Sequence, residues 1–200
     1  MPIAKGSEYG ATGPVPDGVV VVRSDAEARA ALEQARRERR PYPPLGLLGG
    51  DLCRTLGGGA SRGGELVGVR FPVDLGVVLA DGRIHLFVAS LVARTRLWTR
   101  AFVALNAQWL GPWNLGPRAH PGDGLLDTYD ARLAPRQVVA VAARARQGAH
   151  LPHPGIRERR TSAMQVDLER ALPLRLDGVV VGEARTLAIR VEPDALLVVV

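Results

Sequence analysis

The sequence predicts an α+β protein, in which a β-sandwich-like, mainly antiparallel domain is preceded by a short βαβ segment. The first observation is that strand-like runs recur from about residue 67 to the C-terminus, with turn signals between them. The second is that two short apolar runs, at residues 19–22 and 45–48, flank a segment with helical periodicity. Many short strands separated by glycine-bearing turns are typical of a sandwich or a partly closed barrel. A strand, a helix and a strand in succession favour a parallel pair of strands.

The N-terminal part carries signals for where its elements begin. Residues 1–18 are rich in glycine and proline, so we expect a flexible leader. The β-branched residues 19–22 predict a short buried strand. Ser24 is expected to cap a helix over residues 25–40, and Glu27 three positions later completes a capping box.

A glycine-rich turn follows the second strand. Residues 45–48 lead into Gly49, Gly50 and Asp51, after which a short helical turn is expected. Glycines between a strand and a helix let backbone N–H groups approach an anion, and Arg54 is close enough in sequence to reach a phosphate. These four residues are therefore a candidate phosphate or nucleotide site. The alternative is an ordinary strand-to-helix turn that Asp51 caps.

The remainder of the chain reads as a β-rich domain. One helix over residues 135–147 interrupts the strands, and Pro135 suits its first turn. We divide the chain into a leader over 1–18, a βαβ segment over 19–59 and the β-rich domain over 65–200, with a glycine-rich linker before the last. The expected strands of this domain cover residues 67–71, 73–79, 83–92, 100–106, 125–131, 165–167, 172–176, 187–191 and 196–200.

Charge and cysteine usage limit the partners and the compartment. The net charge is +6 and the basic residues are almost all arginine, since Lys5 is the only lysine. This excess indicates an anionic partner such as a phospholipid, a nucleotide or a nucleic acid, although a GC-rich coding sequence would also favour arginine. Cys53 is the only cysteine, which excludes an intrachain disulfide and fits the reducing cytoplasm. No apolar stretch is long enough to span a bilayer, so any membrane contact is expected to be peripheral.

Two loop aspartates are candidate metal ligands. Asp123 and Asp127 are hard oxygen ligands close in sequence, and a carboxylate with neighbouring carbonyls can hold Mg²⁺. The alternative is an Asp-Gly turn that leads into a strand. His150 and His153 also lie close together, but with no third ligand in view a metal site there is not expected.

Two further segments are candidates for chemistry and for membrane contact. Asp177 lies at the tip of a predicted hairpin, where it can act as a general base if its neighbours hold it near a hydroxyl group, or can simply form the turn. Arg94, Arg96, Trp98 and Arg100 alternate in a pattern that suits contact with anionic lipid, with the tryptophan at the interface. A solvated edge strand explains that pattern equally well.

The order of these motifs resembles the diacylglycerol kinase and bacterial lipid kinase family, which shares its fold with NAD kinases. Residues 49–57 are similar to the family's Gly-Asn-Asp-Phe-Ala-Arg-x-Leu-Gly motif, and residues 73–76 to its Ile-Asp-Leu-Gly strand. Residues 106–127 are similar to the family's stretch that begins with Asn-Gly and ends with Asp-Gly-x-Leu-Asp. Residues 176–178 are similar to its Leu-Asp-Gly-Glu motif. The resemblance covers about residue 44 to the C-terminus, and less securely residues 19–40.

The resemblance implies roles for several residues and implies two cofactors, ATP and Mg²⁺. Asp177 corresponds to the family's proposed proton acceptor. Asp123 corresponds to its magnesium ligand, with the carbonyls of His120 and Leu125 as companions. The implied partner is a diacylglycerol-like lipid, anionic or neutral, at the inner membrane surface.

The sequence also departs from the family. Where the family has a Gly-Gly-Asp-Gly-Thr phosphate loop, this chain has residues 23–27, which contain no glycine, and Glu27 adds a negative charge. The family's glutamate after Asp-Gly is Val179 here, and the strands that the family places earlier are absent, so the βαβ segment resembles a remnant of a nucleotide-binding domain. We therefore predict a non-catalytic or weakly active, lipid-binding relative of these kinases.

Two other functions stay open. One is an active ATP-dependent lipid kinase completed by oligomerisation, for instance by a homodimer formed through the exposed edge of residues 19–22. The other is a basic nucleic-acid-binding β-barrel, which the high pI favours. Trp98, Trp109 and Trp113 do not fall on one strand as a base-stacking platform requires, which argues against nucleic acid.

Overall fold

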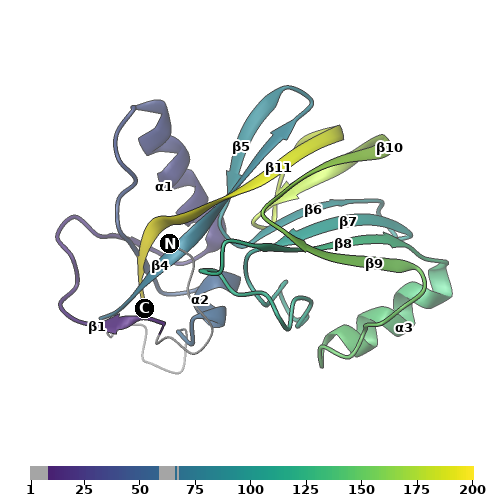
Figure 1. The fold of residues 1–200 in the computed structure, drawn as a ribbon, viewed down its shortest axis with the longest axis horizontal. Coiled ribbons are helices and arrows are strands. Elements are labelled where there is room, and N and C mark those ends of the chain that lie inside the picture. The colour runs from purple at the N-terminus through teal and green to yellow at the C-terminus, as the bar shows by residue number, and fades with distance from the viewer. Residues whose placement is uncertain (1–8, 59–65, 67) are drawn as a thin grey trace.

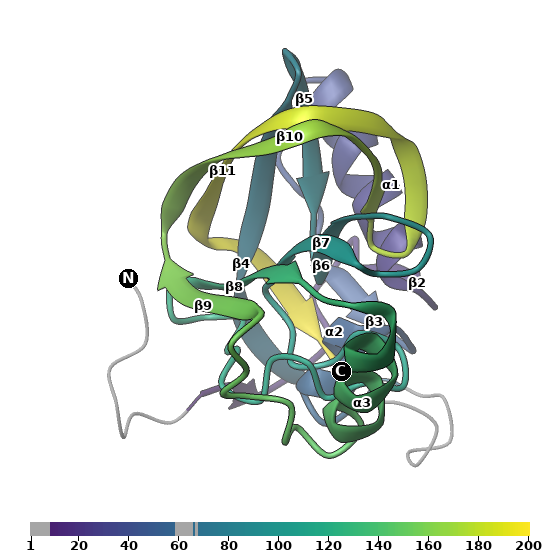
Figure 2. The same cartoon turned by 90° about the vertical axis from the view of Figure 1, so that its right-hand side faces the viewer.

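The computed structural model describes residues 9–58, 66 and 68–200, which form one mostly antiparallel sheet with few helices. The β-rich part has the sandwich-like arrangement that the sequence predicts: the long strands β10 and β11 arch over the shorter strands that follow β5 (Figures 1 and 2). The elements are β1 Ala11–Thr12, β2 Val20–Val22, α1 Asp25–Arg37, β3 Leu45–Leu47, α2 Asp51–Thr55, β4 Val69–Ala80, β5 Arg83–Phe87, β6 Ser90–Arg94, β7 Arg100–Leu105, β8 Leu126–Arg132, α3 Pro135–Ala145, β9 Ile156–Thr161, β10 Ala163–Leu176 and β11 Val179–Val199.

Strand β11 holds the sheet together. The strand order is β1-β4-β11-β10-β6-β7-β8-β9, and β5 pairs with β4. β11 pairs with β4 along one edge and with β10 along the other, and its register against β4 shifts between Glu192 and Leu196. Such an irregularity bends a strand, so β11 can pair with β10 along its first part and with β3 of the βαβ segment at its end.

The βαβ segment forms as expected and continues the same sheet. β2 and β3 are parallel, and β3 also pairs in parallel with the end of β11. The predicted Ser24 cap is present, since the Glu27 N–H donates to the Ser24 hydroxyl at 3.2 Å. The second half of the expected capping box is shifted by one residue, because the Glu27 carboxylate accepts the Arg23 N–H at 2.8 Å and not that of Ser24. The helix ends earlier than expected, because Arg39 takes a positive φ of 54° that cannot continue it.

The predicted parts share a hydrophobic core. One buried cluster joins side chains of the βαβ segment, such as Leu32 and Leu45, to β4 and β11 side chains such as Leu75 and Leu196. A second cluster fills the space between the long strands and β6 and β7. Most of the predicted linker, and residues 1–8 of the leader, lie outside the described residues, whereas Ala11–Thr12 pairs with β4 as strand β1.

Several strands differ from the prediction for identifiable reasons. The expected strand over residues 83–92 is two strands, β5 and β6, and β10 and β11 are each longer than their apolar runs. Strand β9 was not predicted, because its sequence is dominated by charged residues; it pairs with β8 alone. Asp81-Gly82 and Asp177-Gly178 form hairpin turns in which both residues have positive φ, as the tight turn between twisted strands requires. Asp123-Gly124 lies in a longer loop.

Helix α3 covers the far end of the sheet, beside β8 and β9 (Figure 1). It begins at Pro135, as predicted, and the Gln137 side chain accepts the Ala134 N–H at 2.8 Å. None of the helices in the described part of the chain has the length and apolar character needed to cross a bilayer.

Candidate ligand site

Asp177 is buried at the tip of the β10–β11 hairpin. Its carboxylate accepts three backbone N–H groups, from Val88 at 3.1 Å, Ala89 at 2.9 Å and Ser90 at 3.1 Å. Burial disfavours the charged form and raises the pKa of Asp177 to about 7, against the lowering effect of these N–H donors. The group is thus held firmly in place and titrates near neutrality, as a general base requires.

Asp25, at the start of α1, is the second buried carboxylate of the site. It accepts the N–H groups of Asp51 at 2.6 Å and Leu52 at 3.2 Å, and burial raises its pKa to about 6. Its charge also contributes to the raised pKa of Asp177. Two acidic groups with pKa values near neutrality therefore face the same space.

Arg29 was missed by the sequence analysis. It lies one helical turn after Asp25 on the buried face of α1, and its Nε atom is 3.8 Å from an Asp177 carboxylate oxygen. The Nε atom is buried and makes no hydrogen bond within the described residues. The helical spacing of four from Asp25 was the signal available in the sequence.

The glycine turn after β3 packs against the turn before α1. A Cβ atom on Gly49 would lie 2.5 Å from the Arg23 carbonyl oxygen, and one on Gly50 would collide with the Asp25 carboxylate. Gly50 also has a φ of 100°, which side chains rarely adopt. Both positions need glycine because two segments of this chain meet there.

The remaining nucleotide candidates are also engaged within the chain. The Asp51 carboxylate accepts the Gly111 N–H at 2.9 Å, and Arg54 donates to the Gly111 carbonyl at 3.2 Å. The Arg54 guanidinium also lies 3.3 Å from the ring centroid of Trp109. The N–H groups of Asp51 and Leu52 at the start of α2 donate to the Asp25 carboxylate, so these two amides are not open to a triphosphate.

A polar hollow of about 280 Å³ connects these residues to the predicted membrane segment. Carboxylates line one part of it and arginines with tryptophans line another. Its wall is formed by Asp25, Asp51, Ser90, Val92, Arg94, Trp98, Leu110, Gly111, Pro112, Trp113, Arg175, Asp177 and Gly178. Asp51, Arg94, Trp98 and Asp177, predicted separately, thus face one space.

The predicted metal ligands lie away from this hollow. An arginine of β9, Arg160, pairs with Asp123 and donates from Nε to Asp127 at 2.8 Å. The His120 ring accepts the Gly122 N–H at 3.2 Å, and the Leu125 N–H donates to Asp123 at 3.0 Å. No group of three or more His, Cys, Asp or Glu side chains that could hold a metal occurs in the described part of the chain. Both carboxylates already pair with the single Arg160 guanidinium, so a Mg²⁺ ion at this loop would have to displace that arginine.

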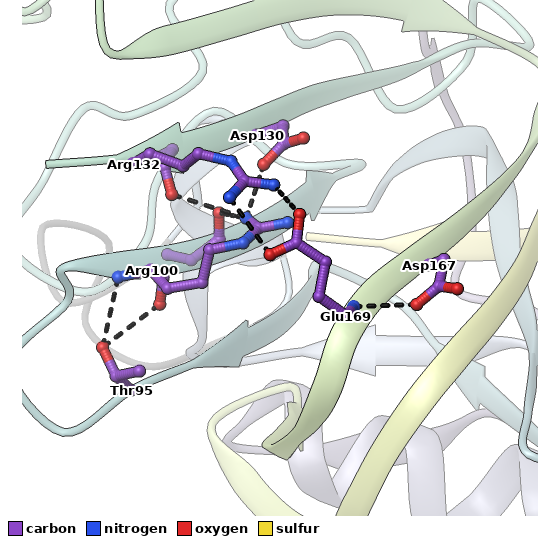
Figure 3. Close-up of polar contacts among 8 residues, drawn as sticks. Thr95, Arg100, Asp130, Arg132, Asp167 and Glu169 are labelled. Carbon is purple, nitrogen blue, oxygen red and sulfur yellow. Dashed lines mark hydrogen bonds and ion pairs between the residues drawn. The ribbon is translucent and has the colours of Figure 1, made fainter.

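The residues of the predicted membrane segment, Arg94, Arg96, Trp98 and Arg100, have different environments in the fold. Arg100 is buried and paired with Asp130 at 2.5 Å, and its N–H donates to the Thr95 hydroxyl at 3.2 Å (Figure 3). Arg94 lies over the Trp98 ring at 4.5 Å and lines the hollow, whereas Arg96 is exposed at the tip of the turn. Arg100 therefore has a partner inside the protein, and the other three residues surround the turn before β7.

An apolar cavity of about 90 Å³, absent from the sequence-based expectations, lies between α3 and the sheet. Two polar side chains in its wall, Tyr129 and His150, are 3% and 2% exposed. The Tyr129 hydroxyl and both His150 ring nitrogens make no hydrogen bond within the described residues. The cavity is lined by Trp98, Ala101, Val103, Trp113, Leu115, Tyr129, Ala131, Leu133, Val138, Val141, Ala142, Ala145, His150 and Ile156.

Comparisons with known proteins agree with this fold. Residues 77–200 match the family model of the YegS C-terminal NAD kinase beta sandwich-like domain. A proposed diacylglycerol kinase from Bacillus anthracis str. Sterne has a similar structure, with a TM-score of 0.67 and 15% identity over 91% of this chain and 78% of that one. A second diacylglycerol kinase structure from the same organism gives a TM-score of 0.64 at 14% identity, over 91% and 76% of the two chains. No curated protein matches the sequence.

Proposed function

Since the chain belongs to the family of the YegS C-terminal NAD kinase beta sandwich-like domain, we propose that it binds a lipid without transferring phosphate. Its fold is that of a diacylglycerol or lipid kinase. The observation that carries the proposal is the apolar cavity beneath α3, which offers a site for an acyl chain. Each buried methylene group contributes about 0.8 kcal/mol to binding, so even a few of them give useful affinity.

The polar atoms of this cavity support a ligand rather than a packing defect. Burial of an imidazole or a hydroxyl without a hydrogen-bond partner costs about 1–3 kcal/mol each. His150 and Tyr129 both meet that description. A lipid that carries a hydroxyl or carbonyl group beside its apolar chain would satisfy them, which favours an ester or hydroxylated lipid over a plain hydrocarbon.

The proposal that the protein transfers no phosphate is based on the turns at the starts of α1 and α2. Phosphoryl transfer depends on positioning and charge neutralisation around the triphosphate. At α1 the helix cap uses the N–H groups of Arg23 and Glu27, and at α2 the Asp25 carboxylate accepts those of Asp51 and Leu52. ATP would have to compete with acceptors of the protein itself for these four amides, and Mg²⁺ would have to compete with Arg160 for Asp123 and Asp127.

An active kinase is the second candidate, and one observation favours it. Asp177 lines the hollow with a pKa of about 7, a value suited to removing a proton from a lipid hydroxyl. A homodimer could supply the missing nucleotide contacts, because β3 is the one partner of β2 among the described strands and Val21 of β2 is 46% exposed.

We place the protein in the cytoplasm, in peripheral contact with the inner membrane surface. The turn before β7 supports this: Leu97 is 65% exposed, beside the exposed Arg96 and the partly exposed Trp98. An apolar tip flanked by arginine suits an anionic bilayer surface. Arg96→Ala and Trp98→Ala should weaken vesicle co-sedimentation; partitioning equal to wild type would remove this turn from the membrane contact.

A helix-matched pair of variants tests the cavity. Ala142→Phe fills the cavity from α3, whereas Val139→Phe adds the same ring on the 72% exposed side of that helix. Binding to phosphatidylcholine vesicles containing diacylglycerol should weaken by about tenfold or more in Ala142→Phe and stay unchanged in Val139→Phe. Equal binding by the two variants would overturn the lipid site.

Calorimetry and a turnover assay test the part of the proposal that says the protein transfers no phosphate. We expect no measurable heat of ATP binding with Mg²⁺ present, and no labelled phosphate in diacylglycerol vesicles. Phosphorylation that Asp177→Asn abolishes would overturn the non-catalytic proposal and leave the lipid site intact.

A further inference from the structure

Two arginines in the polar hollow have no acidic partner. Arg94 donates from Nη1 to the carbonyls of Thr95 and Arg96, both at 3.1 Å, and its buried Nε atom makes no hydrogen bond in the described part of the chain. Arg175 donates to the Gly178 carbonyl at 3.0 Å. Neither side chain forms an ion pair with any described residue. Both guanidinium groups line the same hollow.

The sheet register places these arginines on one face. Arg175 of β10 pairs directly with Val92 of β6, and Arg94 lies two residues beyond Val92. Because side chains alternate along a strand, Val92, Arg94 and Arg175 all point into the hollow. The ring of Trp98 lies against the Arg94 guanidinium and limits its movement. The two cations are therefore fixed by strands and not carried on mobile loops.

This arrangement is unfavourable without a ligand. Burial lowers the pKa of Arg94, and the positive charge of Arg175 lowers it further. The buried arginines of the described chain have carboxylate partners: Arg100 pairs with Asp130, and Arg29 lies within ion-pair distance of Glu33 and Asp177. Two neighbouring guanidinium groups that share a hollow and lack such a partner are typical of a site for an anion.

We propose that Arg94 and Arg175 bind the phosphate of a phosphate ester, with a phospholipid headgroup as the ligand. The inference rests on the proposed lipid-binding function and narrows its substrate class from neutral diacylglycerol to a phosphate-bearing lipid. Planar guanidinium groups match phosphate oxygens in pairs, which gives geometry as well as attraction.

The opposite wall of the hollow suits the rest of such a headgroup. Asp25 and Asp177 line it, and carboxyl groups that titrate near neutrality can both accept and donate hydrogen bonds to hydroxyls. A glycerol or other polyol attached to the phosphate would reach from the arginines toward these acids.

Vesicle binding by the full chain and by charge-matched variants tests the proposal. Vesicles contain phosphatidylcholine alone, with diacylglycerol, or with phosphatidylglycerol; a soluble arm uses sn-glycerol 3-phosphate. The double variant Arg94→Gln/Arg175→Gln is compared with Arg83→Gln/Arg170→Gln, which removes two arginines from exposed positions. Thermal unfolding checks that both variants fold.

We expect wild type to prefer phosphatidylglycerol vesicles over diacylglycerol vesicles by about tenfold or more. Arg94→Gln/Arg175→Gln should lose that preference, while Arg83→Gln/Arg170→Gln keeps it. If the two double variants weaken binding equally, the effect is general surface charge and the site is overturned. Binding of diacylglycerol vesicles as tightly as phosphatidylglycerol vesicles would also overturn it, while the lipid-binding function would stand.

The remaining outcomes separate the two proposals. Glycerol phosphate that binds as tightly as the lipid, and is lost in Arg94→Gln/Arg175→Gln, supports the phosphate site and assigns it to a soluble ester. Failure of wild type to bind any vesicle or glycerol phosphate overturns both the lipid-binding function and the phosphate site.

Discussion

The turn at the starts of α1 and α2 differs from the cavity beneath α3 in whether its buried polar groups have hydrogen-bond partners. At the turn, the Asp25 carboxylate accepts the N–H groups of Asp51 and Leu52. In the cavity, the Tyr129 hydroxyl and the His150 ring nitrogens have no hydrogen-bond partner within the described residues. The turn is the region that resembles a nucleotide site in sequence, yet its Asp25 carboxylate and two of its amides bind each other without a ligand.

The difference separates a structural role from a binding role. A buried polar group with all its hydrogen bonds stabilises the fold, whereas one without them destabilises the empty protein. A glycine motif or an aspartate does not reveal in sequence which of the two applies. The predictions that follow measure both regions, beginning with the largest expected effect.

Asp25→Ala should have the largest effect, because it leaves the Asp51 and Leu52 N–H groups without an acceptor. We expect the free energy of unfolding to fall by about 3 kcal/mol, measured by urea denaturation. Asp17→Ala, at an exposed position, is the matched control and should change stability by less than about 0.5 kcal/mol. A loss at Asp25 no larger than that of the control would mean that the turn is not internally completed.

The two buried carboxylates should make stability depend on pH in an unusual direction. The pKa of Asp177 is about 7 in the folded protein, against 3.8 as the ordinary value, so the folded state binds more protons than the unfolded state between these pH values. Stability should therefore fall as pH rises from about 4 to 7, by about 3 kcal/mol. Asp25, with a pKa of about 6, adds to this in the lower part of the window.

Denaturation midpoints across that pH range measure this effect, and Asp177→Asn is the comparison. The variant cannot titrate at this position, so its profile should be flatter than that of wild type. A wild-type stability that rises between pH 4 and 7 would contradict the raised pKa values.

His150→Leu should stabilise the empty protein while weakening lipid binding. It replaces an unpaired buried imidazole by an apolar side chain in an apolar cavity, for an expected gain of about 1 kcal/mol, or about 2–4 °C in melting temperature. His153→Leu is the matched control: its ring accepts the Gly155 N–H at 3.0 Å, so its loss should lower stability. Destabilisation by both substitutions would imply a partner for His150.

The sequence predicted the fold better than it predicted the site. Hairpin turns such as Asp177-Gly178, the helix cap at Ser24 and the parallel pair in the βαβ segment are local patterns, and the structure contains all three. Strand β9 could not be predicted, because its charged residues give no local strand signal and become a strand by pairing with β8. For the same reason, the ion pair between Arg160 of this strand and Asp123 could not be predicted.

Site residues from distant segments were predictable only in part. Asp177 was found because it interrupts an apolar strand pattern in a known motif, whereas Arg29 and Arg175 look like ordinary surface arginines until their strands and helix are placed. The cavity beneath α3 depends on how one helix lies across three strands, and no local pattern encodes that. Hydrogen-bond satisfaction, the property that distinguishes the two regions, is a feature of the folded chain alone.

The smallest effect is expected at the ion pair between Arg132 and Glu169 (Figure 3). These side chains are 59% and 60% exposed, so water screens the attraction and ordering two long side chains offsets much of it. Glu169→Gln should leave the urea midpoint of unfolding unchanged, and a double-mutant cycle with Arg132→Gln should give no measurable coupling. A coupling as large as that of a buried hydrogen bond would mean that solvent-exposed pairs contribute as much here as buried ones. The contrast between the α1–α2 turn and the α3 cavity would then lose its basis, since that contrast assumes that burial sets the energetic weight of each polar group.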